Sequence, residues 1–171
     1  MVKIVGIDPG VQPSMALRDT ATGFIEFCED TSALVKKGKS ERTEPRPHLV
    51  CAVLRRWKPD IVCIEAVTPI ARKEGRAQGL ASTANFMRAR GILEGCCAGL
   101  SIQYELVAPQ QWQRDLRIKS GHELVRAAAI NMFPAQEHKL KLKKDHNKAA
   151  ALMLAIWIER YLLPNHPLLL L

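Results

Sequence analysis

The chain has 171 residues, of which 47% are hydrophobic and 25% are charged, which suits one globular domain over residues 1–171 and excludes a disordered chain. Lysine and arginine number 25 against 17 acidic residues, and the resulting formal charge of +8 fits either a polyanionic partner or a merely basic surface. The apolar C-terminal run LPNHPLLLL is far shorter than the ~20 residues of a membrane span, so we expect no membrane partner.

The first third of the sequence predicts three antiparallel strands. Residues 2–8 (VKIVGID) are rich in β-branched residues and end at a Pro-Gly turn, and residues 15–19 and 23–28 follow with a short turn between them. Residues 29–44 are polar and carry several lysines, so we expect a loop there. The apolar spacing of residues 49–57 predicts a helix that begins after two prolines.

The remainder of the sequence alternates between strands and helices. The apolar run DIVCIEAV (60–67) and the segment SIQYELVAP (101–109) predict two further strands. Helices are expected over residues 79–99, from Pro109 onward, and over residues 120–132 and 146–162. This order of elements predicts an α/β domain with a mixed five-stranded sheet flanked by helices.

Two carboxylates close strands in this scheme, Asp8 the first and Glu65 the fourth. Side chains at the carboxyl ends of adjacent strands converge, and two acids there favour a cation such as Mg²⁺ between them. Each acid also has a purely structural interpretation: Asp8 as a turn residue before Pro-Gly, and Glu65 as the partner of Arg72 in a salt bridge. The acids and the basic excess together favour a metal-dependent site that acts on nucleic acid.

Several motifs, in this order, resemble the RuvC-type Holliday junction resolvases: IVGIDPG, MALRD, CIEAV and DHNKA. The segment VAPQQWQRDL is similar to the phage-encoded branch of that family. The resemblance implies a ribonuclease H-like fold, a single RuvC-like nuclease domain and a homodimer. It also implies two Mg²⁺ or Mn²⁺ ions with no small-molecule cofactor, and symmetric nicking of four-way DNA junctions.

The resemblance makes Asp8 and Glu65 metal ligands and catalytic residues, and it places the remaining ligands on DHNKAAA, at the start of the last helix. Asp145 and His146 are the candidate catalytic residues there. Asp145 is also a candidate metal ligand, with the helix N-cap as its alternative role. His146 is a candidate to bind metal or orient water, with a solvent-exposed histidine as the alternative. Ala150 stands where the family has an acid, so this metal-ligand position holds no ligand.

Two explanations fit Ala150: a natural, weakened family member, or an acid-to-alanine change made to hold substrate without cutting it. The retained acids and lysines around the position favour the second. We therefore expect a Holliday junction resolvase impaired by an inactivating substitution. The alternatives are a non-catalytic branched-DNA-binding protein, or a ribonuclease H-like nuclease of broader specificity for branched DNA.

Basic side chains near these motifs are candidates to bind DNA phosphates, although each of them also suits a solvated surface. The helix over residues 79–99 has small residues that suit either dimerisation, as in the family, or packing on its own sheet. The three tryptophans lie in apolar surroundings and predict core positions. The candidate DNA-binding residues are Arg72, Lys73, Arg76, Arg88, Lys119, Lys143, Lys144 and Lys148.

The five cysteines include no CxxC pair, and most lie in apolar runs, which is typical of buried thiols in a reducing compartment. Asp8 interrupts the short apolar run at the N-terminus, which argues against a secretory signal. We therefore expect an intracellular, cytoplasmic protein, located in the bacterial host cell if the chain is phage-encoded.

Overall fold

The computed structural model describes residues 2–37, 40–66 and 80–165. Within these residues, no helix is long and apolar enough to cross a membrane.

A five-stranded sheet with the strand order β3-β2-β1-β6-β7 forms the centre of the molecule. The first three strands along the chain pair antiparallel, whereas β6 runs parallel to β1 and β7 runs parallel to β6. The sheet is therefore mixed, as predicted. Its strands are β1 (Lys3–Asp8), β2 (Ser14–Asp19), β3 (Ile25–Cys28), β6 (Ile61–Glu65) and β7 (Gln103–Val107).

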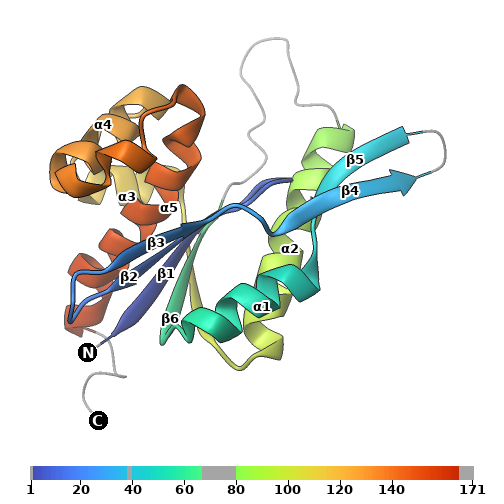
Figure 1. Ribbon diagram of the computed structural model, residues 1–171, viewed down its shortest axis with the longest axis horizontal. Helices are drawn as coiled ribbons and strands as arrows, with labels where there is room; N and C mark the ends of the chain where they lie inside the picture. The colour runs from blue at the N-terminus through green and yellow to red at the C-terminus, as the bar shows by residue number, and fades with distance from the viewer. Residues whose placement is uncertain (1, 38–39, 67–79, 166–171) are drawn as a thin grey trace.

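Helices cover both faces of the sheet (Figure 1). Alternate residues of β1 point to opposite faces, so Val5 and Ile7 pack with α1 and α2, whereas Ile4 packs in the cluster that includes α5. The helix α4 packs on α5 on that second face. The helices are α1 (Pro47–Trp57), α2 (Leu80–Gly99), α3 (Pro109–Asp115), α4 (His122–Met132) and α5 (His146–Trp157).

Short 3₁₀ and π-helical turns precede and follow α5. The helix predicted over 146–162 ends as α5 at Trp157, and a single π-helical turn (Ile158–Leu162) continues it. The 3₁₀ turns are Pro134–Lys139, Lys143–Asp145 and Leu163–Asn165. All three tryptophans are buried, as predicted.

The helix α5 lies directly against β1 at Gly6. A Cβ atom at Gly6 would lie 1.9 Å from the carbonyl oxygen of Ala151 and 2.8 Å from the backbone nitrogen of Ala155. Ala149 and Ala151 are fully buried. Small residues on both elements thus let the helix backbone approach the strand, which brings the first turns of α5 close to the carboxyl end of β1.

The prediction of a loop over residues 29–44 is wrong for most of that range. Residues Ser32–Lys37 and Ser40–Pro45 form an antiparallel pair of strands, β4 and β5, outside the main sheet. Its base is fixed by a hydrogen bond from the Arg46 amide to the Thr31 carbonyl, and Glu44 of β5 pairs with Arg88 of α2. Leu34 is exposed, and the residues of the two strands (SALVKK and SERTEP) do not alternate between apolar and polar, so the sequence did not indicate strands here.

Candidate active site

A cavity of about 320 Å³ opens at the carboxyl ends of β1 and β6. It lies where ligands bind in open α/β sheets, beyond the carboxyl ends of parallel strands. Residues from β1, β6, α2, α3, α4 and α5 line it, among them Asp8, Glu65, Phe86, Trp112, His122, His146, Asn147 and Ala150.

The structure brings Asp8 and Glu65 together in this cavity. The parallel register pairs Ile7 with Ile64, so the two acids follow at equivalent positions of adjacent strands. Burial and then the charge of Glu65 raise the pKa of Asp8 well above its usual value. Burial also raises the pKa of Glu65, although a hydrogen bond from Trp112 opposes that rise. Both groups are therefore costly to ionise without a cation nearby.

The carboxylates of Asp8 and Glu65 fit a hard divalent cation that takes only some of its ligands from the protein. Among the described residues, no group of three or more His, Cys, Asp and Glu side chains is arranged to hold a metal ion. Mg²⁺ needs only one or two carboxylates and takes its remaining oxygens from water and phosphate. Asp8 and Glu65 supply those two carboxylates, and their raised pKa values are what a site adapted to positive charge shows in its metal-free form.

These pKa shifts predict a pH-dependent stability. Because the pKa of folded Asp8 lies above the usual value of 3.8, its protonation contributes stability that is fully present below that value and lost as pH rises through the folded pKa. Without metal, the melting temperature should therefore fall as pH rises through the folded pKa of Asp8, and Mg²⁺ should restore it.

The variant Asp8→Asn tests this pH dependence. Above the folded pKa of Asp8 and without metal, it should melt at about 2–4 °C higher than the parent, since one buried charge is gone, and Mg²⁺ should no longer stabilise it as strongly. Differential scanning calorimetry across pH measures both effects. A variant less stable than the parent at every pH would contradict this assignment of Asp8.

Ala150 faces the same cavity as the two acids. Its neighbours Ala149 and Ala151 are fully buried, whereas Ala150 is only partly buried. The position singled out from the sequence thus lies beside Asp8 and Glu65, and a methyl group stands there without any oxygen donor.

Asp145 does not line the cavity, in contrast to its expected role as a ligand. It is 3% exposed, and both of its oxygens have partners: Oδ2 accepts the Leu142 amide at 2.7 Å, and Oδ1 accepts the Lys148 ammonium at 2.9 Å. Burial opposes ionisation, but the Lys148 and Leu142 hydrogen bonds prevail and lower the pKa of Asp145. These contacts favour the alternative role, in which Asp145 fixes the turn that leads into α5.

His146 and Asn147 do line the cavity. His146 Nδ1 lies 3.0 Å from the Lys143 carbonyl oxygen, which can only accept a hydrogen bond, so Nδ1 carries the proton. In the neutral ring Nε2 then keeps its lone pair and is able to accept a proton or bind a metal. The ring of His122 packs edge-on against His146 with 4.1 Å between centroids. No sequence pattern singled out His122.

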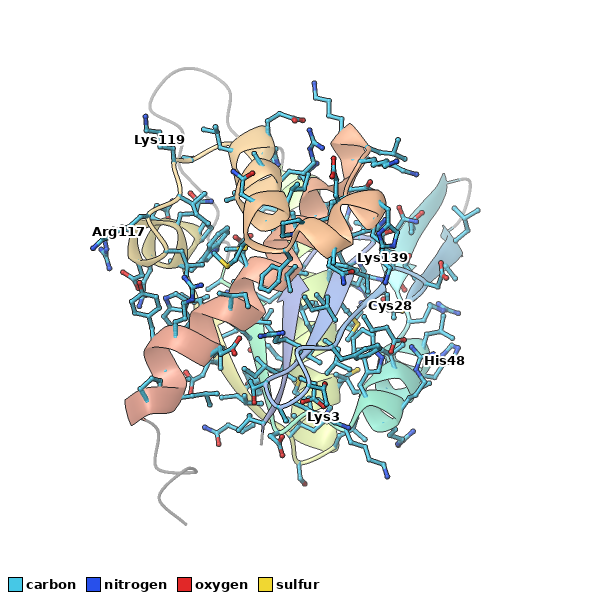
Figure 2. All side chains as sticks on the ribbon, turned by 60° about the vertical axis from the view of Figure 1, so that its left-hand side comes forward. Lys3, Cys28, His48, Arg117, Lys119 and Lys139 are labelled. Carbon is cyan, nitrogen blue, oxygen red and sulfur yellow. The ribbon has the colours of Figure 1, made fainter. Side chains whose placement is uncertain are left out.

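The lysines and arginines expected to bind DNA differ in whether an acidic side chain of the protein already pairs with them. Lys148 pairs with Asp145 and with Glu29, which neutralises its ammonium within the protein and argues against a phosphate contact. Arg88 pairs with Glu44, although its side chain stays exposed. Lys143 and Lys144 are exposed before α5, and Arg117 and Lys119 project outward between α3 and α4 (Figure 2). Arg72, Lys73 and Arg76 lie outside the described residues.

Comparisons with known proteins identify the fold. No family model and no curated protein sequence matches the chain. The RuvC protein of Thermus thermophilus in complex with a Holliday junction substrate is similar in structure, with a TM-score of 0.58, 14% sequence identity, and coverage of 94% of this chain and 96% of that chain. A second Thermus thermophilus RuvC structure gives a TM-score of 0.55 at 17% identity and covers 92% and 95%. The predicted ribonuclease H-like fold is confirmed.

Proposed function

We propose that this chain is a Holliday junction resolvase, a metal-dependent endodeoxyribonuclease for four-way DNA junctions, whose cutting is impaired by Ala150. The observation that carries the proposal is the cavity shared by Asp8, Glu65 and Ala150. Its place at the carboxyl ends of β1 and β6, on a fold also found in a protein bound to a Holliday junction, supports a site for DNA cleavage.

Asp8 and Glu65 would hold Mg²⁺ or Mn²⁺. An acid at position 150 would supply the further ligand that a pair of ions requires. When bound, such ions activate water and stabilise the leaving oxygen of a phosphodiester. His146 would orient the attacking water through Nε2, the nitrogen left free by the Lys143 carbonyl. Lys143 and Lys144 would bind the adjacent backbone phosphates, and no small-molecule cofactor is required.

A second candidate function is binding of branched DNA without cleavage. The specific observation that favours it is the methyl group of Ala150 in place of an oxygen ligand within the cavity. Both candidates share the same DNA-binding surface, and only catalysis separates them.

The chain as it stands should bind a four-way junction more tightly than a linear duplex of equal length. Replacing Lys143 and Lys144 with alanine should weaken binding and reduce the slope of log affinity against log salt by about 0.9 for each lost phosphate contact. A matched control replaces Lys3, which begins β1 (labelled in Figure 2), and Lys58, which lies between α1 and the start of β6. It should leave the slope unchanged. Gel shifts over a salt series measure this, and equal affinity for both DNAs would count against a junction-specific function.

A homodimer is part of the proposal, and one face of α2 supports it. Ala84, Met87, Gly91, Gly95 and Ala98 are exposed along this helix. A Cβ atom at Gly91 or Gly95 would meet nothing within 4 Å, so the described part of the chain leaves this face uncovered. The opposite side of α2, including Leu93 and Cys97, packs on the sheet. The exposed small residues would let two copies of α2 approach closely.

Light scattering should give the mass of two chains for the parent and of one chain for Gly95→Arg, because a large charged side chain blocks close approach. The fold should be kept, since no described atom lies near a Cβ at that position. A dimeric variant would exclude this face as the interface.

A further inference from the structure

Trp112 joins the short helix α3 to one of the two acids in the cavity. Its side chain is 1% exposed, and its Nε1–H donates a hydrogen bond to Glu65 Oε1 at 2.9 Å. Both side chains line the cavity, and 47 positions separate them in the sequence. We propose that Trp112 is a positioning residue that orients the Glu65 carboxylate for metal binding, an inference that rests on the proposed function.

The chemistry of the bond suits that role. An indole N–H only donates, so it favours the ionised carboxylate, the form that binds a metal. A carboxylate has two oxygens, so a bond to Oε1 fixes the plane of the group without consuming Oε2. The hydrogen bond also opposes the rise in the pKa of Glu65 that burial causes. Trp112 thus keeps a buried acid available for a cation.

The helix that carries Trp112 is itself anchored at its far end. The Asp115 carboxylate accepts the Nε1–H of Trp157 at 2.9 Å, and the Asp115 carbonyl accepts the hydroxyl of Tyr161. Pro109 begins α3 next to the cavity, immediately after the end of β7. The helix α3 therefore connects the C-terminal helical segment with Glu65, and a rigid support of this kind is what orients a metal ligand.

The other two tryptophans provide matched controls. Trp157→Phe also removes a buried indole hydrogen bond to a carboxylate, but that carboxylate belongs to Asp115 rather than to the cavity. Trp57→Phe removes a buried indole whose Nε1 has no hydrogen-bond partner among the described residues. Only Trp112→Phe removes a hydrogen bond to Glu65 itself, whereas Trp157→Phe removes one of the two anchors of α3 and should act on Glu65 less strongly.

The test measures the pKa of Glu65 by carboxyl ¹³C NMR in the full-length, metal-free protein and its three Trp→Phe variants. Trp112→Phe should raise this pKa most. Trp157→Phe, which loosens one anchor of α3, should shift it less, and Trp57→Phe should leave it at the parent value. Mn²⁺ affinity, followed by water-proton relaxation, should fall by about 10- to 100-fold in Trp112→Phe and recover as pH rises. An unchanged pKa in Trp112→Phe, or equal shifts in all three variants, would overturn the proposal.

A second measurement avoids the risk that Trp112→Phe does not fold. In the parent, the Nε1–H resonance of Trp112 should titrate with the pKa of Glu65, and Glu65→Gln should abolish that titration. The resonances of Trp57 and Trp157 serve as internal references. A Trp112 resonance that is indifferent to Glu65→Gln would also overturn the proposal. If the parent binds no Mn²⁺, the proposed metal site fails, while the NMR titrations still decide whether Trp112 controls Glu65.

Discussion

Replacing Ala150 with aspartate is expected to tighten Mg²⁺ binding by about 10- to 100-fold and to raise the rate of DNA cleavage by more than about 100-fold. The new carboxylate would enter the cavity that already holds Asp8 and Glu65. Three acids then share the charge of the ions, and the metal shell no longer depends on two carboxylates alone. Isothermal titration calorimetry measures the affinity, and single-turnover nicking measures the rate.

Ala150→Asn is the matched control, because it has nearly the shape of aspartate without the charge. It should gain far less metal affinity than Ala150→Asp and should cut DNA little better than the parent. Equal affinity and equal cleavage in the parent and Ala150→Asp would show that position 150 is not a vacated ligand position.

The largest effect on stability is expected from Gly6→Ala. The new methyl group would lie 1.9 Å from the carbonyl oxygen of Ala151, and neither backbone can yield without moving α5 away from β1. Such overpacking should cost about 3 kcal/mol or more and lower the melting temperature by about 6–12 °C. Because α5 carries His146, Asn147 and Ala150, its displacement should also disturb the cavity.

Gly10→Ala is the control for this prediction. A Cβ atom at Gly10 would make ordinary contacts at 3.8 and 3.9 Å with Gln12. Its melting temperature should stay within a few degrees of the parent in thermal unfolding followed by circular dichroism. A Gly6→Ala protein as stable as Gly10→Ala would contradict the close packing of α5 on β1.

The sequence predicted the elements that have a strong local signal. β-branched runs that end on acids defined β1 and β6, and parallel pairing then required Asp8 and Glu65 to converge. The strand pair formed by β4 and β5 was missed because its residues do not alternate between apolar and polar and therefore resemble a loop. Gly6 stood within a predicted strand, where glycine is a sign of close backbone approach, but its partner in α5 was not predictable.

The parts of the site that escaped prediction depend on contacts distant in sequence or on side-chain direction. Trp112 was correctly expected in the core, but its bond to Glu65 spans 47 positions and has no sequence signature. From the sequence alone, Asp145 suited either a metal ligand or a helix cap. Only its hydrogen bonds with Leu142 and Lys148 in the structure favour the cap. His122 begins α4 without any motif, so nothing connected it with His146.

The nuclease function is tested by incubating Ala150→Asp, beside the double variant Ala150→Asp/Glu65→Gln, with a labelled four-way junction, a flap and a linear duplex in Mg²⁺. We expect paired, symmetric nicks in the junction by the single variant, little cutting of the duplex, and no cutting by the double variant. Absence of cleavage of every DNA by a folded Ala150→Asp protein that binds the junction would contradict the nuclease function.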